Sequence, residues 1–415
     1  MNTSFQTSTL PLILLAGGLA TLLVLPVLRA MFDAGWSAWI FAGVAAASGG
    51  ASTFLLRQKL SRASFISLAL FGLLIATLIF SSLLNGTLVS NDLVNLLLLF
   101  SVFLLGCLLR DPKLIWGVLA TIVALSAILS VNLIFTTQLD FSLYHYNPRD
   151  NYLSNGMRQA ISAATLSSIL AYTFLIGTYR QATFLLLVFL FVIIVAGLGL
   201  NYGRGALLSG LIAVTLSFVL ASLTATSKTQ HLGHFGAVKK TFIGLLAPIS
   251  VSAALYLLAT TVPRTAGRIQ RALEGGETPR FQLWTDSFTH ISQAPFLGHG
   301  IGASKTFHGT YPHNILLQIT EDGGIVATSL FIVFVGFLFL TATKKLFASP
   351  DPLGLALIAG SLVPLINSQT TGDFYTWILL FTMLGLLAAW SSINPNKMQH
   401  RGMCQPLSDT RGPFP

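Results

Sequence analysis

Charged residues and cysteines are both scarce in this chain of 415 residues. Asp, Glu, Lys and Arg together make up 9% of the residues, whereas hydrophobic residues make up 53%. This balance excludes an ordinary soluble globular protein and is typical of a polytopic membrane protein. The two cysteines, Cys107 inside an apolar run and Cys404 in the tail, predict neither a disulfide nor a metal site.

Sequence motifs for nucleotides and metals are also missing. No Walker loop occurs, which argues against a nucleotide-driven pump. There is no DxD motif or aspartate pair, and the spacing of His290, His299 and His308 does not match a helical HExxH pair. We therefore expect no metal site and no cofactor, so that any bound phosphate must be neutralised by arginine.

The chain consists mainly of apolar runs, from residue 10 to residue 392. Runs of roughly 18–24 residues are long enough to cross a hydrocarbon core of about 30 Å. They predict an all-α polytopic membrane protein with about twelve transmembrane helices, in a single transmembrane domain over residues 1–415. The first run lacks the charged n-region and cleavage site of a signal peptide, so we expect it to remain as a helix. The predicted spans are 10–30, 36–56, 63–84, 93–109, 114–135, 159–178, 182–201, 205–223, 241–262, 324–343, 352–370 and 374–392.

Basic residues indicate the orientation of these spans. Lys and Arg in short loops mark the cytoplasmic side of a membrane, and with twelve spans most basic loops and the tail fall on one side. Both termini are therefore expected in the cytoplasm. Topology and contact with membrane lipids explain the net charge of +10, so this charge does not predict nucleic-acid binding.

A group of arginines breaks this rule, because it falls on the opposite, exoplasmic side. Topology gives these residues no reason to be there, and arginine in particular suggests a phosphate or carboxylate partner. The exceptions are Arg149, Arg158, Arg204, Arg264, Arg268, Arg271 and Arg280, together with Lys305.

The long hydrophilic segment at residues 262–324 lies on the same exoplasmic side. Charge is scarce elsewhere, so a segment that concentrates arginine, histidine and glycine beside a membrane is where chemistry is expected. We predict a loop at residues 263–323 whose short amphipathic helices carry the site. Within it, Arg264, Arg268 and Arg271 follow helical spacing; this stripe either binds substrate or only holds lipid headgroups or nearby glutamates.

Two arginines have settings that favour anion binding. Arg204 lies between Gly203 and Gly205 in a short link between spans, where glycine lets a bulky group approach. Arg280 follows Pro279 and opens a predicted amphipathic helix on the membrane surface, whose free N–H groups would add to an anion-binding corner. The alternatives are that Arg204 only reaches lipid phosphate and that the helix has no ligand.

His313 follows Pro312 and begins HNILLQITEDGG, a half-apolar helix that leads into the tenth span. Histidine can take up a proton near neutral pH. If the loops converge, a base beside two arginines is the minimum apparatus for moving a phosphate-activated group to a hydroxyl. The alternative is that His313 is a polar helix cap.

Four motifs resemble those of the O-antigen ligase and polymerase superfamily of bacterial envelope glycosyltransferases, over about residues 195–345. They are YGRGALLSG at the end of a span, RFQLW, the PFLGHGIG turn and PHNILLQITEDGG. The resemblance implies a GT-C-like helical membrane fold with a periplasmic helical loop, and a glycan donor built on undecaprenyl pyrophosphate. It also implies transfer to an acceptor hydroxyl on the periplasmic side of the bacterial inner membrane, without metal or nucleotide.

The same resemblance gives roles to single residues. Arg204 and Arg280 match the family's functional arginines and would hold the pyrophosphate, and His313 matches its functional histidine. That histidine would activate or orient a hydroxyl of the lipid A-core oligosaccharide for attack on the anomeric carbon, with inversion. The candidate substrate-binding residues are Arg158, Arg264, Arg268, Asn314 and Asp373, and for Asp373 the alternative is a structural role.

The residues leave other functions open. A polymerase of the same superfamily would use a second lipid-linked glycan as acceptor, and the short interval between Arg280 and His313 leaves the acceptor undecided. A protein-glycosylating relative is the less favoured alternative, because such proteins usually carry an extra carboxy-terminal periplasmic region. A transporter would place ionisable residues near mid-membrane, whereas charges here cluster at span ends, although Pro248 and Pro364 interrupt two spans.

Overall fold

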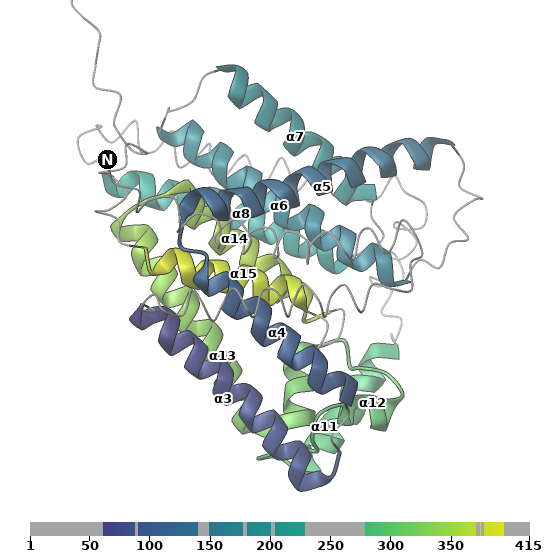
Figure 1. Ribbon diagram of the computed structural model, residues 1–415. Helices are drawn as coiled ribbons and strands as arrows, with labels where there is room; N and C mark the ends of the chain where they lie inside the picture. Colours follow the sequence, from purple (N-terminus) through teal and green to yellow (C-terminus); the bar gives the residue numbers. More distant parts are fainter. Residues whose placement is uncertain are drawn as a thin grey trace, which may run out of the picture.

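The computed structural model describes residues 61–87, 90–139, 149–176, 181–200, 204–228, 279–370, 374 and 377–393. Within these ranges, every regular element is a helix (Figure 1). The predicted spans 10–30, 36–56 and 241–262 lie outside the described residues. The helices are α3 (Arg62–Asn85), α4 (Ser90–Leu108), α5 (Pro112–Leu139), α6 (Arg149–Ile176), α7 (Gln181–Leu200), α8 (Arg204–Lys228), α11 (Pro279–Gln293), α12 (Ala303–His308), α13 (Ile315–Ala348), α14 (Pro352–Asn367) and α15 (Ile378–Ser391).

The predicted spans inside the described ranges each coincide with a helix, from α3 to α8 and from α13 to α15. Two boundaries were wrong, because α6 begins at Arg149 and α13 at Ile315, each well before the predicted start. The protein is a multi-pass helical membrane protein, as its composition predicts. Among the described residues, five segments are long and apolar enough to cross a membrane, namely α3, Pro112–Phe135 of α5, α7, Gly205–Thr224 of α8, and α13.

Helix α13 begins early because the half-apolar HNILLQITED run and the apolar span form one element of 34 residues. Asn314 caps its first turn, since the side-chain oxygen accepts from the N–H groups of Leu316 and Leu317 at 3.0 and 3.1 Å. The helix then continues with one kink, at Gly324. A single element therefore joins the polar segment to the predicted span.

Helix α6 packs against α5, α7, α8 and α14. Every residue from 156 to 168 is buried. Hydroxyls bridge these helices at close range: Ser162 Oγ donates to Ser126 Oγ at 2.8 Å, and Ser168 Oγ donates to Ser217 Oγ at 2.9 Å. Because α6 meets other helices on all sides over this stretch, it can carry more polar residues than a lipid-facing span.

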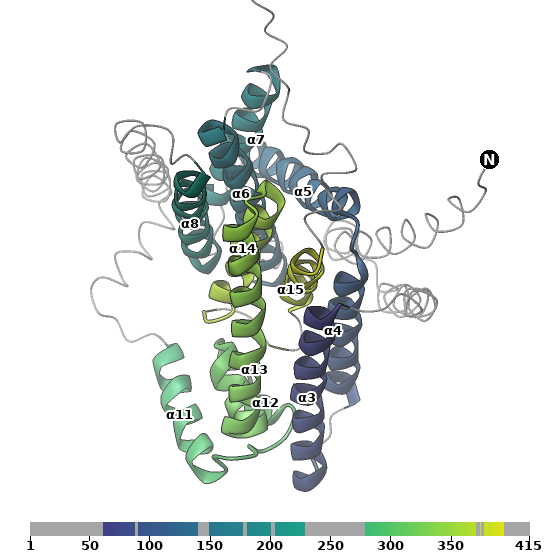
Figure 2. The same cartoon turned by 90° about the vertical axis from the view of Figure 1, so that its left-hand side faces the viewer.

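Helices α3, α4, α13 and α15 share an aromatic core. The Phe71 ring stacks on Phe381 and on Phe334, with centroids 4.7 and 5.2 Å apart. At one end of α13, the Lys345 ammonium donates to the carbonyls of Trp390 and Ile393, just after α15. Figure 2 shows α11 and α12 beside the other end of α13, far from α7. The polar segment is thus built onto the end of α13 that carries His313.

Candidate active site

The turn that leads into α13 holds His313 in an unusual backbone conformation. Its φ of 55° is the only positive φ of a non-glycine residue in the part of the chain that the structure describes. Such a conformation costs about 1–3 kcal/mol, although histidine tolerates it better than most residues. Contacts on both sides fix it: the Trp284 Nε1–H donates to the Pro312 carbonyl at 2.9 Å, and the Ile315 N–H donates to the Ser368 carbonyl at 3.0 Å.

The start of α8 packs against the end of α14, next to the His313 turn. A Cβ on Gly205 would come within 2.2 Å of Asn367 Oδ1 and 2.5 Å of Thr370 Oγ1, so only glycine lets α8 touch the end of α14 this closely. Ser368, between those two residues, is the one that binds the backbone after His313. The first residues of α8 and α13 are therefore brought together at the end of α14. Arg204 opens α8, and its side chain lies outside the described residues.

Arg158 lies near the level of this junction, on α6. Helices α6 and α8 run in the same direction, since Ala160 faces Gly210 and Ser168 bonds to Ser217 further along. At 1.5 Å of rise per residue, the first turn of α8 stands beside the α6 residues just before Ala160. Arg158 is 4% exposed there. A charge at this depth beside the helix ends suits an anionic ligand that reaches into the protein.

Helix α11 brings Arg280 toward the His313 turn. Arg280, Trp284 and Ser287 are four and three residues apart, so they share one face of α11. Trp284 donates to the Pro312 carbonyl of this turn. The backbone of Arg280 lies about one helical turn, about 5.4 Å along α11, before Trp284. The Arg280 side chain is exposed. The helix predicted to open at Arg280 is confirmed; it begins one residue earlier, at Pro279, so Arg280 lies in its first turn.

The PFLGHGIG turn repairs the kink in α13. At Gly324 the backbone has φ 67° and ψ −169°, which breaks the helical hydrogen bonds around it. The Glu321 and Asp322 carbonyls instead accept from the N–H groups of His299 and Gly300, both at 2.8 Å. The Ile325 N–H in turn donates to the Pro295 carbonyl at 2.8 Å. Each polar group freed by the kink thus finds a partner in the turn, which gives this motif a structural role.

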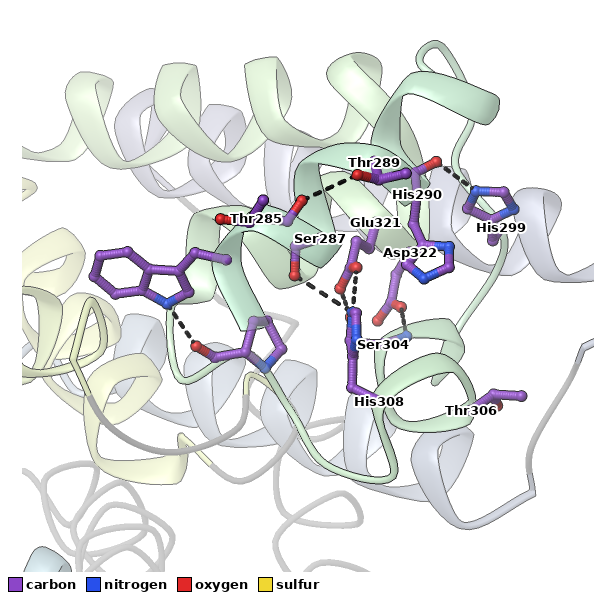
Figure 3. Close-up of polar contacts among 12 residues, drawn as sticks. Thr285, Ser287, Thr289, His290, His299, Ser304, Thr306, His308, Glu321 and Asp322 are labelled. Carbon is purple, nitrogen blue, oxygen red and sulfur yellow. Dashed lines mark hydrogen bonds and ion pairs between the residues drawn. The ribbon is translucent and has the colours of Figure 1, made fainter. Parts of the chain in front are cut away.

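Sequence reasoning missed a buried polar network next to this kink (Figure 3). His308 Nε2 lies 2.8 Å from Glu321 Oε1 and 3.4 Å from Ser287 Oγ, and the Ser304 hydroxyl donates to Glu321 Oε2. Glu321 is fully buried. An acidic residue inside a helix of a chain with 9% charge was the available signal, because a buried carboxylate needs a partner.

The neighbouring histidines pack around an aromatic ring. His290 stacks on Phe307 with centroids 4.1 Å apart, and His299 Nε2 lies 2.8 Å from the His290 carbonyl oxygen. Within the described ranges, no group of three His, Cys, Asp or Glu residues is arranged to hold a metal ion. Other candidates lie outside those ranges, namely Arg264, Arg268 and Asp373, although the N–H of Phe374 donates to Gln318 Oε1 of α13 at 2.8 Å.

The fold and the site define a multi-pass helical membrane protein whose candidate site lies where helix ends meet a polar segment. Residues 166–332 match the family model described as O-Antigen ligase. The chain is also similar to an O-antigen ligase of Pseudomonas aeruginosa strain PAO1, with 27% identity over 197 residues that cover 44% of this chain and 46% of the relative. The match thus spans less than half of the relative's length.

These matches confirm the predicted resemblance to the O-antigen ligase and polymerase superfamily. The stretch matched by the family model includes Arg204, Arg280 and His313, whereas Arg158 and Asp373 fall outside it. The three residues with the clearest sequence motifs therefore lie within the shared region, as do Arg264, Arg268 and Asn314.

Proposed function

We propose that this protein transfers a glycan from undecaprenyl pyrophosphate to a hydroxyl of the lipid A-core oligosaccharide, on the periplasmic side of the bacterial inner membrane. The similarity to O-antigen ligases supports a glycosyl-transferring enzyme with lipid-linked substrates. The proposal is supported by the contact of Trp284 of α11 with the Pro312 carbonyl, and by the bond from Ile315 to Ser368 at the end of α14, where the start of α8 packs. Helices α11 and α8 begin with the segments that bear Arg280 and Arg204. A base beside two guanidinium groups suits sugar transfer from a pyrophosphate.

In the proposed reaction, the acceptor hydroxyl oxygen attacks the anomeric carbon of the donor sugar, and the bond from that carbon to the phosphate oxygen breaks. Undecaprenyl pyrophosphate leaves with the electron pair, and the anomeric configuration is inverted. The hydroxyl proton passes to the imidazole of His313. Arg204 and Arg280 neutralise the charge that grows on the leaving pyrophosphate, so the reaction needs neither metal nor cofactor.

The remaining candidates extend this site. We propose that Arg158 and Asn314 also contact substrate; Arg158 lies near the level of the start of α8, and Asn314 is adjacent to His313 in the chain. Both termini lie in the cytoplasm in this proposal, the loop at residues 263–323 faces the periplasm, and residues 1–415 form one transmembrane domain. The further substrate-binding residues are Arg264, Arg268 and Asp373.

The test is glycan transfer by the purified protein in proteoliposomes that contain lipid-linked polymer and lipid A-core oligosaccharide. We expect Arg280→Ala and His313→Ala to reduce transfer by at least about 100-fold. Arg62→Ala is the matched control, because Arg62 is also an exposed arginine that opens a helix. Wild-type transfer by both folded site variants would exclude the proposed mechanism.

The acceptor is tested in a deletion strain by lipopolysaccharide banding. Loss of all polymer from the core, with lipid-linked polymer accumulating, supports the ligase reaction. A single repeat unit on the core would instead indicate the polymerase, and an unchanged pattern would contradict both.

A further inference from the structure

The network around Glu321 joins three elements that are separate in the sequence. Glu321 belongs to α13, Ser304 and His308 belong to α12, and Ser287 belongs to α11. Figure 3 shows Ser287 and Glu321 both approaching the Nε2 edge of the His308 ring. The side chains of His308 and Glu321 are 3% and 0% exposed. No substrate can therefore reach them without rearrangement of the segment.

Both oxygens of the Glu321 carboxylate have a donor. His308 Nε2 lies 2.8 Å from Oε1, and the Ser304 hydroxyl donates to Oε2. The backbone N–H of Ser304 also lies 3.4 Å from Asp322 Oδ1, so α12 is held by two consecutive acidic residues of α13. Hydrogen bonds to a buried charged group are stronger than neutral ones and are costly to break. The network thus fixes α12 on α13 in one arrangement.

The same network reaches α11 through Ser287, whose Oγ lies 3.4 Å from His308 Nε2. Ser287 is fully buried and stands seven residues, two helical turns, after Arg280 on the same face. Between them, Trp284 binds the Pro312 carbonyl beside His313. Helix α11 is therefore held at these two points along the face that carries Arg280, in addition to the contacts of His290 with Phe307 and His299. The Ser287 contact is the one that joins α11 to His308, the partner of Glu321.

We propose that Glu321, His308 and Ser304 are positioning residues that set the place of α11, so that Arg280 is presented to the donor pyrophosphate beside His313. They act through α11 and do not touch substrate. This inference rests on the proposed function for the role of Arg280, but the placement of α11 can be measured without any reaction.

The experiment compares Glu321→Gln and the milder Ser287→Ala with Ser292→Ala, an exposed serine of the same helix. Glutamine keeps the size of Glu321 but removes its negative charge and one acceptor oxygen, so the hydrogen bonds from His308 and Ser304 lose their charge assistance. We expect Glu321→Gln to raise the donor KM roughly tenfold while the acceptor KM stays within about twofold. In an Arg280→Ala background, Glu321→Gln should have little further effect, because both changes act through the same group.

Placement is measured separately with spin labels on Phe288→Cys of α11 and Ile332→Cys of α13, both exposed, in a chain without Cys107 and Cys404. We expect the distribution of distances between the two labels to broaden or shift in Glu321→Gln and in Ser287→Ala, but not in Ser292→Ala. Unchanged distances, or effects of Glu321→Gln and Arg280→Ala that add fully, would overturn the inference. If the wild-type protein transfers no glycan while the distances still shift, the proposed function fails and the placement of α11 by the network stands.

Discussion

Two polar regions lie near the same end of α13 and differ in how their groups are satisfied. Around Glu321, a buried carboxylate has a donor for each oxygen, and the PFLGHGIG turn supplies partners for the backbone groups freed at Gly324. Around His313, the backbone is held in a strained conformation, and Arg280 is exposed. The satisfied region supports the structure, and the site that we propose lies in the region with exposed charge and strain.

The largest effect should come from removing the imidazole in the strained region. His313→Asn keeps a residue that tolerates positive φ but removes the base. We expect kcat to fall about 10³-fold, equivalent to about 4 kcal/mol, with thermal stability in detergent unchanged. A kcat near that of the wild type would show that His313 has a structural role and is not the base.

Adding a methyl group at the kink should destabilise the satisfied region. In Gly324→Ala, the new Cβ would lie 2.1 Å from the Phe296 carbonyl oxygen, at a φ of 67° that alanine rarely adopts. The expected loss of stability is about 3 kcal/mol, measured as a lower melting temperature. Gly336→Ala on the same helix is the control, because nothing lies within 4 Å of its Cβ position. Equal melting temperatures for the two variants would contradict the structural role of the kink.

A smaller effect is expected where α8 meets α14. Gly205→Ala places a Cβ against Asn367 and Thr370, and separating the two helix ends should cost about 2 kcal/mol. Because Arg204 is adjacent, donor binding should weaken as well. The pair of measurements is the melting temperature and the donor KM, with Gly117→Ala as a control that adds a methyl group into open space. A weaker donor interaction without any loss of stability would place Gly205 in contact with substrate rather than with α14.

The smallest effect separates the capping role of Asn314 from its predicted substrate contact. Asn314→Ala should lower stability by about 1 kcal/mol, because the first N–H groups of α13 lose their acceptor. Asn314→Ser retains a capping oxygen and should restore the melting temperature. If transfer by Asn314→Ser also returns to the wild-type rate, the amide makes no substrate contact.

The helices were predictable from the sequence because long apolar runs leave few other structures in a membrane. The start of α11 was predictable from Pro279 and the aromatic spacing behind it. A half-apolar helix over HNILLQITEDGG was also predictable, but not its continuity with the following span, because the polar residues around Gly324 suggested two separate elements. The capping contact of Asn314 shows where the single helix begins.

The motifs of the candidate site could be predicted from the sequence, but their positions relative to one another could not. Nothing local to Arg204 or His313 indicates that both lie at the end of α14, since that depends on the packing of Gly205 and on the bond from Ile315 to Ser368. The contact between His308 and Glu321 was also not predicted, because histidine spacing predicts only metal motifs and says nothing of a carboxylate partner. Contacts between distant segments follow from tertiary packing rather than from periodicity.

The length of α13 relates the chemistry to the thickness of the bilayer. Its 34 residues span about 51 Å, whereas the hydrocarbon core of a bilayer is about 30 Å thick. Lys345 donates to carbonyls at the end of α15 and so fixes the opposite end of α13 there, and much of the surplus length falls on the side of His313. The length of α13 therefore sets the height of the His313 imidazole above the acyl chains. In the proposed reaction, a thicker or thinner membrane would move the lipid pyrophosphate relative to that height, so we expect turnover to depend on bilayer composition.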